Sequence, residues 1–332
     1  MAGAVLVPGL AVAAVLCGAV PWAVACLFVP VLESSPRAKA ANYRGAEAVH
    51  GLGAAWLVWG GCALIARWAL EDFGLPLLVS ETIGACGALG VAASAFGLLD
   101  DTYGTREVRG FSGHVRALLA GRLTTGGLKL LGIGVASLAA ARVVADLAPW
   151  GGSWVGVLLA GSSVALTANL VNLVDVRPGR ALKVYLVLAA FAVALAAAAL
   201  AGAYGTAAAS AAAVLAVALI GPAAASWRYD LGERAMLGDA GANAMGAAAG
   251  LAIVAAMPLA GLVAFGVVML ALNLASERTS FSSVIDRTPL LARLDALGRT
   301  ARPGEDAGRG ERSTPSSRYD DHDGSGGDPR EV

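Results

Sequence analysis

Long runs of apolar residues, separated by short polar connectors, limit the folds that are open to this chain. A helix needs about 20 mostly apolar residues to cross the roughly 30 Å hydrocarbon layer of a membrane. Hydrophobic residues make up 57% of the sequence and charged residues 14%, which excludes an ordinary soluble enzyme and a disordered protein. We expect an all-α fold, a polytopic transmembrane bundle in the cell membrane. Nine spans are predicted near residues 5–31, 52–70, 77–99, 126–147, 153–172, 182–201, 205–224, 240–256 and 259–275.

Positive charge gathers in every second connector. Lys and Arg occur in the connectors near residues 37–44, 106–129, 177–183 and 228–234, whereas the connectors between these carry almost none. The positive-inside rule then predicts an external N-terminus and a cytoplasmic C-terminus. No Lys or Arg precedes Arg37, so we expect the first apolar segment to be retained as a span instead of being cleaved as a signal peptide.

The composition changes after the last span. Residues 1–300 are predicted to form a membrane-embedded domain. Residues 301–332 are rich in Gly, Pro, Ser and charge, which predicts a disordered cytoplasmic tail. Between these parts, the stretch 288–299 predicts a short amphipathic helix on the inner membrane surface. Its apolar residues recur at helical spacing, and they are Leu290, Leu291, Leu294 and Leu297.

Acidic residues collect at the cytoplasmic ends of the predicted spans. Asp100 and Asp101 end the third span, Asp175 follows the fifth, and Asp239 opens the eighth. Polar groups at membrane depth are costly, so their position is a guide to function. We therefore expect a polar cleft that faces the cytoplasm and is lined by these carboxylates.

The residue types in this region are those of phosphoryl transfer. Mg²⁺ is usually bound by one or two carboxylates together with substrate phosphates and waters. Asn169, Asn172 and Asp175 are spaced three apart and would share one face of a helix. Asp239 opens a Gly-rich helix, whose first N–H groups favour phosphate oxygens. Cations that could neutralise phosphates occur at Lys129, Arg177, Arg180 and Lys183.

Four stretches together resemble a known superfamily. They read FGLLDDTYG, GRLTTGGLK, NLVNLVDVRPGRALK and MLGDAGANAMG, and NYRG and HGLG in residues 42–53 precede them. The chain resembles the polyprenyl-phosphate N-acetylhexosamine-1-phosphate transferases, a glycosyltransferase family 4-like group. That group includes the phospho-N-acetylmuramoyl-pentapeptide transferases and the UDP-N-acetylglucosamine-1-phosphate transferases. The resemblance covers roughly residues 1–275, in the same order along the chain.

The resemblance implies an activity and roles for the matched residues. The activity is Mg²⁺-dependent transfer of an N-acetylhexosamine-1-phosphate from a UDP-sugar to a polyprenyl phosphate, with release of UMP, in cell-wall or surface-glycan synthesis. Asp100, Asp101, Asp175 and Asp239 would be catalytic, with Asp101 and Asp239 as metal ligands. The implied substrate-binding residues are Asn169, Asn172, Lys129, Arg180 and Lys183.

The sequence also departs from the family pattern. Gly104 stands where the family often has a third acid, and the C-terminal His motif is missing, since the histidines are His50, His114 and His322. The sugar and the glycan pathway therefore stay open. A non-catalytic member that binds the lipid carrier or scaffolds cell-wall assembly is an alternative, and a membrane transporter is another. The balance of 24 basic and 24 acidic residues predicts no nucleic-acid partner, and a homodimer remains an option.

Overall fold

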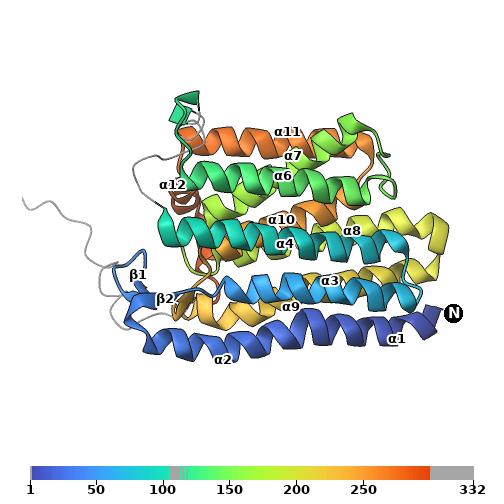
Figure 1. The fold of residues 1–332 in the computed structure, drawn as a ribbon, viewed down its shortest axis with the longest axis horizontal. Coiled ribbons are helices and arrows are strands. Elements are labelled where there is room, and N and C mark those ends of the chain that lie inside the picture. The colour runs from blue at the N-terminus through green and yellow to red at the C-terminus, as the bar shows by residue number, and fades with distance from the viewer. Residues whose placement is uncertain (1, 105–112, 114–115, 118, 300–332) are drawn as a thin grey trace, which may run out of the picture. The chain divides into compact units, whose positions relative to one another are not determined.

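The protein is a bundle of long helices that run side by side and reverse direction at each connector (Figure 1). The computed structural model describes residues 2–104, 113, 116–117 and 119–299. The long helical segments are α1 (Ala2–Val12), the π-helical η1 (Ala13–Ala19), α2 (Val20–Ser34), α3 (Ala54–Asp72), α4 (Leu77–Tyr103), α6 (Thr125–Ala145), α7 (Trp154–Val174), α8 (Arg180–Tyr204), α9 (Thr206–Leu231), α10 (Gly238–Ala256) and α11 (Leu259–Arg278). The predicted all-α bundle is confirmed.

Each predicted span corresponds to one of these helical segments, with ends that differ by several residues. Eight segments of the described chain are long and apolar enough to cross a membrane, and α1, η1 and α2 together make the first of them. Helix α3 is the remaining long helix, and it is more polar because Arg67 and Glu71 lie in its second half. The chain is therefore a multi-pass membrane protein.

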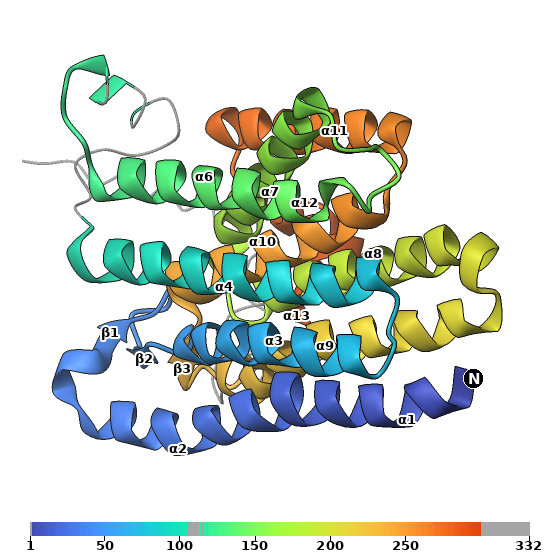
Figure 2. The same ribbon diagram turned by 45° about the vertical axis from the view of Figure 1, so that its right-hand side comes forward.

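Helix α10 lies at the centre of the bundle. It packs mainly against α4, α7 and α8 (Figure 2). In its apolar 18-residue stretch, 94% of the residues are buried. Its sequence is mostly Ala and Gly over the first three turns. Small residues let helix backbones approach closely in a membrane, so this composition allows α10 to be surrounded on all sides. The position of α10 fixes the place of Asp239, which lies in its first turn.

Helices α3 and α4 cross at a pair of glycines. A Cβ atom added to Gly60 would lie 2.7 Å from the carbonyl oxygen of Gly87, whereas one added to Gly61 would have no atom within 4 Å. We expect Gly60→Val to push the two helices apart and to lower the free energy of unfolding by about 1–3 kcal/mol. The matched variant Gly61→Val should change it by less than about 0.5 kcal/mol. Unfolding in mixed detergent micelles measures both, and equal losses would contradict this packing.

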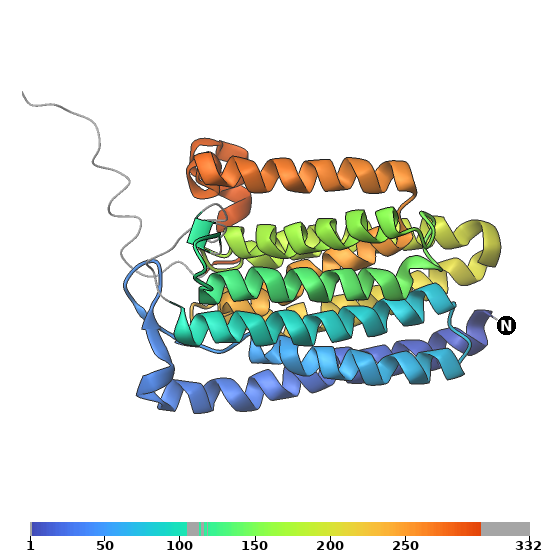
Figure 3. The ribbon, with the colours of Figure 1, turned by 45° about the horizontal axis from the view of Figure 1, so that its top comes forward.

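A small sheet adds to the helices, which the sequence did not predict. Strands β1 (Lys39–Ala41) and β2 (Glu47–His50) pair antiparallel and follow the short 3-10 turn η2 (Pro36–Ala38). β3 (Ala235–Met236) pairs parallel with β2, with Val49 opposite Ala235. Strands of two to four residues are too short to show an alternating pattern. In Figure 3, the connector between α2 and α3 lies at the end of the bundle that is opposite the N-terminus. We call this end the pocket end, because the cavity described below opens there.

Two short helices, α12 (Phe281–Arg287) and α13 (Pro289–Ala296), follow the last span. Helix α13 confirms a helix within the predicted amphipathic stretch, and its leucines are exposed. Asp295 of the same helix is buried. The compact helical unit ends at Arg299, and the predicted tail 301–332 lies outside the described residues.

Candidate functional site

A buried lysine joins two acids at the pocket end of the bundle. The Nζ atom of Lys129, on α6, lies 2.7 Å from Oδ2 of Asp100 on α4 and also pairs with Asp239 on α10. The Lys129 side chain is only 10% exposed. Two of the predicted acids therefore meet at one cation that the sequence had assigned to substrate phosphate. As the structure stands, the Lys129 ammonium balances charge within the protein.

Asp101 binds backbone N–H groups, whereas its neighbour Asp100 forms an ion pair with Lys129. Its two carboxylate oxygens accept hydrogen bonds from the backbone N–H groups of Asp239 (3.1 Å) and Ala240 (3.2 Å). A carboxylate at this position satisfies free donors and interacts favourably with the helix dipole. The N–H groups that we expected to favour phosphate oxygens thus already bind Asp101.

A glycine makes this contact between α4 and α10 possible. Gly238 has a φ of +64°, a conformation that side chains rarely adopt. A Cβ atom there would lie 2.7 Å from Oδ2 of Asp101. The sequence LGDAG at the start of α10 is therefore explained by a left-handed turn that brings the helix start onto a carboxylate.

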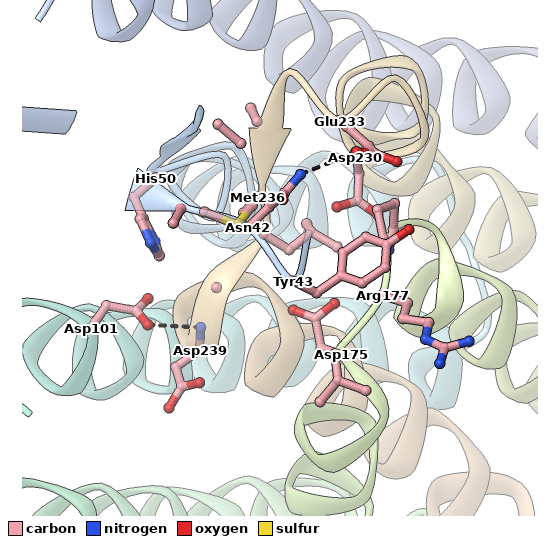
Figure 4. A pocket seen from close by; sticks show the side chains of 17 residues that line it. Asn42, Tyr43, His50, Asp101, Asp175, Arg177, Asp230, Glu233, Met236 and Asp239 are labelled. Carbon is pink, nitrogen blue, oxygen red and sulfur yellow. Dashed lines mark hydrogen bonds between the residues drawn. The ribbon is translucent and has the colours of Figure 1, made fainter. Parts of the chain in front are cut away.

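A cavity of about 310 Å³ opens beside these residues. Figure 4 shows Asp101 and Asp239 on one side of it and Asp175 with Arg177 on the other. Asp230 and Glu233 add two further acids, so the five lining carboxylates come from α4, α9, α10 and two connectors. The volume is at the small end of the range typical of ligand pockets. The pocket gathers much more negative than positive charge.

The first connector covers the pocket. Asn42, Tyr43 and His50 line it together with Met236 of β3. The Asn42 amide donates to Glu233 (3.1 Å), and the Arg44 guanidinium lies 3.3 Å from the same carboxylate. These contacts and the β2–β3 pairing hold residues 39–50 against residues 233–236. The pocket wall thus joins segments that are far apart in the sequence.

None of the five predicted substrate-binding residues lines the cavity, and Lys129 is the one that pairs with Asp100 and Asp239 instead. The Asn169 amide donates to Asn273 on α11 (2.7 Å), and Asn172 lies in the last turn of α7 and contributes its carbonyl oxygen to the N–H of Asp175. Arg180 forms an ion pair with Asp295, and Lys183 donates to the carbonyl oxygen of Asp295. Of the four predicted catalytic acids, Asp101, Asp175 and Asp239 line one pocket, whereas Asp100 does not and pairs with Lys129.

Sequence reasoning missed several lining residues. Asp230 and Glu233 lie in YDLGER, which reads as an ordinary span end, and nothing local distinguishes them. A weak signal existed for Tyr43 and His50, because both fall within the NYRG and HGLG stretches that resembled a family loop. Arg177 was counted among the nearby cations and is the one of that group that lines the cavity.

Asp175 lies just after α7, in the wall of the pocket. Burial raises the pKa of its carboxyl well above the ordinary value, and the nearby charges of Asp230, Asp239 and Asp101 add to this, although Arg180 opposes it. A carboxylate in such surroundings binds either a proton or a cation. Ionised Asp175 therefore favours a positively charged ligand in the pocket.

This raised pKa predicts a pH-dependent difference between the wild type and Asp175→Asn. The folded state keeps the Asp175 proton to higher pH than the unfolded state, so stability is lost as pH rises above about 4, the unfolded value. Asn cannot ionise, so the variant should escape this loss. In EDTA, its thermal midpoint should rise relative to that of the wild type between pH 5 and pH 8, as measured by intrinsic fluorescence. A difference in thermal midpoint that stays the same from pH 5 to pH 8 would contradict a raised pKa of Asp175.

Comparison with known proteins adds no identification. A scan of known protein families found no match, and no curated protein matches the sequence.

Proposed function

We propose that the protein transfers an N-acetylhexosamine-1-phosphate from a UDP-sugar to a polyprenyl phosphate, with release of UMP. The observation that carries this proposal is the pocket, where Asp101, Asp175 and Asp239 meet from three separate parts of the chain. The same three acids lie in the sequence stretches that resemble the sugar-1-phosphate transferases. The proposed cellular role is cell-wall or surface-glycan synthesis, with the pocket on the cytoplasmic face of the cell membrane.

The chemistry of the pocket suits Mg²⁺ that is shared with a substrate. Among the described residues no group of three or more His, Cys, Asp and Glu side chains lies close enough together to hold a metal ion. Mg²⁺ normally keeps several waters and binds one or two carboxylates plus phosphate oxygens. The pocket offers enough carboxylates for this kind of site. Asp239 and Asp101 would hold it, since both line the cavity. Bound there, Mg²⁺ would neutralise the pyrophosphate charge.

The residues of the chain would then position two phosphates for direct transfer. A lipid phosphate oxygen would attack the β-phosphorus of the UDP-sugar, forming one P–O bond while the P–O bond to UMP breaks. Arg177 lines the pocket on the side of Asp175, where it adds positive charge near the phosphates while its guanidinium stays paired with Asp286. Little covalent chemistry by the protein is needed when the reactants are held in line.

The depth of the pocket supports a lipid substrate. Asp101 lies in the last turn of α4, Asp175 just after α7 and Asp239 in the first turn of α10. The ends of membrane spans lie at the level of lipid head groups. A polyprenyl phosphate would place its phosphate at this depth and its chain among the surrounding lipids.

The same depth gives less support to a transporter, whose ionisable groups would lie near the middle of the membrane. A non-catalytic member that binds the lipid carrier remains a second candidate, because Lys129 pairs with two of the acids and reduces the free negative charge.

An exchange assay separates these candidates. Purified protein with undecaprenyl phosphate is incubated with labelled UMP and each of three nucleotides: UDP-N-acetylglucosamine, UDP-N-acetylgalactosamine and the UDP-muramoyl pentapeptide. Mg²⁺-dependent appearance of label in one UDP-sugar supports the transferase. Absence of exchange with all three, in protein that still binds undecaprenyl phosphate, supports the non-catalytic reading.

A further inference from the structure

The two short C-terminal helices fold back on the connector between α7 and α8. Arg177 makes two parallel hydrogen bonds to Asp286 of α12, at 2.8 and 2.7 Å. Arg180 makes two to Asp295 of α13, at 2.8 and 2.9 Å. Paired contacts of an arginine with a carboxylate fix orientation as well as distance. Residues 175–180 are therefore attached to α12 and α13 at two points.

Asp295 is the centre of the inner attachment. Its carboxylate also lies 2.8 Å from Arg299, and its backbone carbonyl accepts from Lys183 at 2.6 Å. The side chains of Asp295 and Arg180 are 6% and 4% exposed, so this pair is hardly screened by water. Burial alone would raise the pKa of Asp295, but the hydrogen bonds and charges of Arg180 and Arg299 outweigh burial and lower it. Asp295 is thus held as an anion at neutral pH.

The attached connector forms part of the pocket wall. Asp175, Val176, Arg177 and Pro178 all line the cavity. On the pocket side, the N–H of Gly179 donates to Asp230 at 2.6 Å, and on the other side Arg299 donates to the carbonyl oxygen of Pro178 at 3.0 Å. The connector is therefore held between one pocket acid and the C-terminal helices.

We propose that α12 and α13 act as a clamp that positions residues 175–178 in the pocket wall, with Asp295 as its principal positioning residue. Asp295 does not line the cavity, so it would act on the ligand through Arg180 and the connector. The ligand in question is the sugar nucleotide of the proposed function, and this part of the inference rests on that function. The clamp itself rests only on the contacts above.

The test compares Asp295→Asn with the wild type by hydrogen exchange and by kinetics. Asn keeps the side-chain volume of Asp295 but lacks the negative charge that pairs with Arg180 and Arg299. We expect backbone exchange in residues 176–183 to speed up about tenfold, with α4 unchanged. Asp295→Glu keeps the charge and should recover part of the protection. Asp146→Asn is the matched control, because Asp146 forms an exposed pair with Arg142 at the other end of the bundle. In this variant, exchange in residues 176–183 should stay within about twofold of the wild-type rate.

The kinetic readout separates positioning from a loss of folded protein. In an active preparation, Asp295→Asn should raise the apparent KM for the sugar nucleotide about tenfold and change kcat by less than about threefold. Loss of folded protein alone would lower kcat and leave KM unchanged, and that result would overturn the proposal. Wild-type protein without any transfer would refute the proposed function, while the exchange data would still decide on the clamp.

A second variant covers the case in which Asp295→Asn loosens the whole protein. The Arg177–Asp286 pair is more exposed, with side chains 29% and 47% accessible, so Asp286→Asn leaves no buried charge unpaired. It should speed exchange in residues 176–178 several-fold and leave α4 unchanged. Unchanged exchange at this connector in both variants, or an equal rise throughout the helices, would overturn the clamp.

Discussion

Asp239→Asn and Asp101→Asn should each lower the rate of Mg²⁺-dependent UMP exchange by about 10²-fold or more. Both changes keep the side-chain volume and remove one negative charge from the proposed metal site. The two should differ in stability, because Asp101 accepts two backbone hydrogen bonds from the start of α10. Asn has one acceptor oxygen and can replace only one of them, so Asp101→Asn should also unfold more easily.

Asp72→Asn is the matched control for this pair. Asp72 is exposed at the end of α3, away from the pocket, so its loss should leave the exchange rate within about twofold. Rates and thermal midpoints are measured on the same purified preparations. The site assignment would be wrong if Asp72→Asn slowed exchange as much as the pocket variants. It would also be wrong if both pocket variants stayed fully active.

Lys129→Met should destabilise the folded protein by about 3 kcal/mol or more in EDTA. The variant removes the cation between Asp100 and Asp239 and leaves two partly buried carboxylates facing each other. If the pocket binds Mg²⁺, the ion should take over part of this role, so added Mg²⁺ should restore more stability to Lys129→Met than to the wild type. Unfolding in mixed micelles, with and without Mg²⁺, measures the difference.

Two controls define what Lys129 contributes. Lys129→Arg keeps the charge and should lose much less stability. Lys39→Met breaks an exposed ion pair with Glu47, of 3.4 Å, and should cost no more than about 1 kcal/mol. A loss for Lys129→Met as small as that for Lys39→Met would show that the buried pairs do not hold α4, α6 and α10 together.

The helices could be predicted because their signal is local. Each span is a continuous apolar run, so residues 126–147, for example, predicted α6 (Thr125–Ala145) closely. The charged ends of the spans also indicated which acids share one end of the bundle. Asp101, Asp175 and Asp239 do line one pocket, although their catalytic and metal-binding roles stay predictions.

The partners of the basic residues could not be predicted, because they depend on contacts between distant segments. Lys129 lies 110 positions from Asp239, and Arg180 lies 115 positions from Asp295. No local pattern distinguishes an arginine that binds phosphate from one that pairs with a later carboxylate. The sheet was missed for the same reason, since the β2–β3 pairing joins residues 49 and 235.

That pairing has a consequence for how the protein is made. Residues 39–50 leave the ribosome long before residues 235–236, which supply the neighbouring strand, and Glu233, which binds Asn42. One edge of β2 in the first connector therefore stays unpaired while most of the helices are synthesised and inserted. Such edges are prone to wrong pairing and to proteolysis. The pocket is then one of the last parts of the molecule to be assembled, and a nascent chain released before residue 235 has all its early helices but no closed pocket.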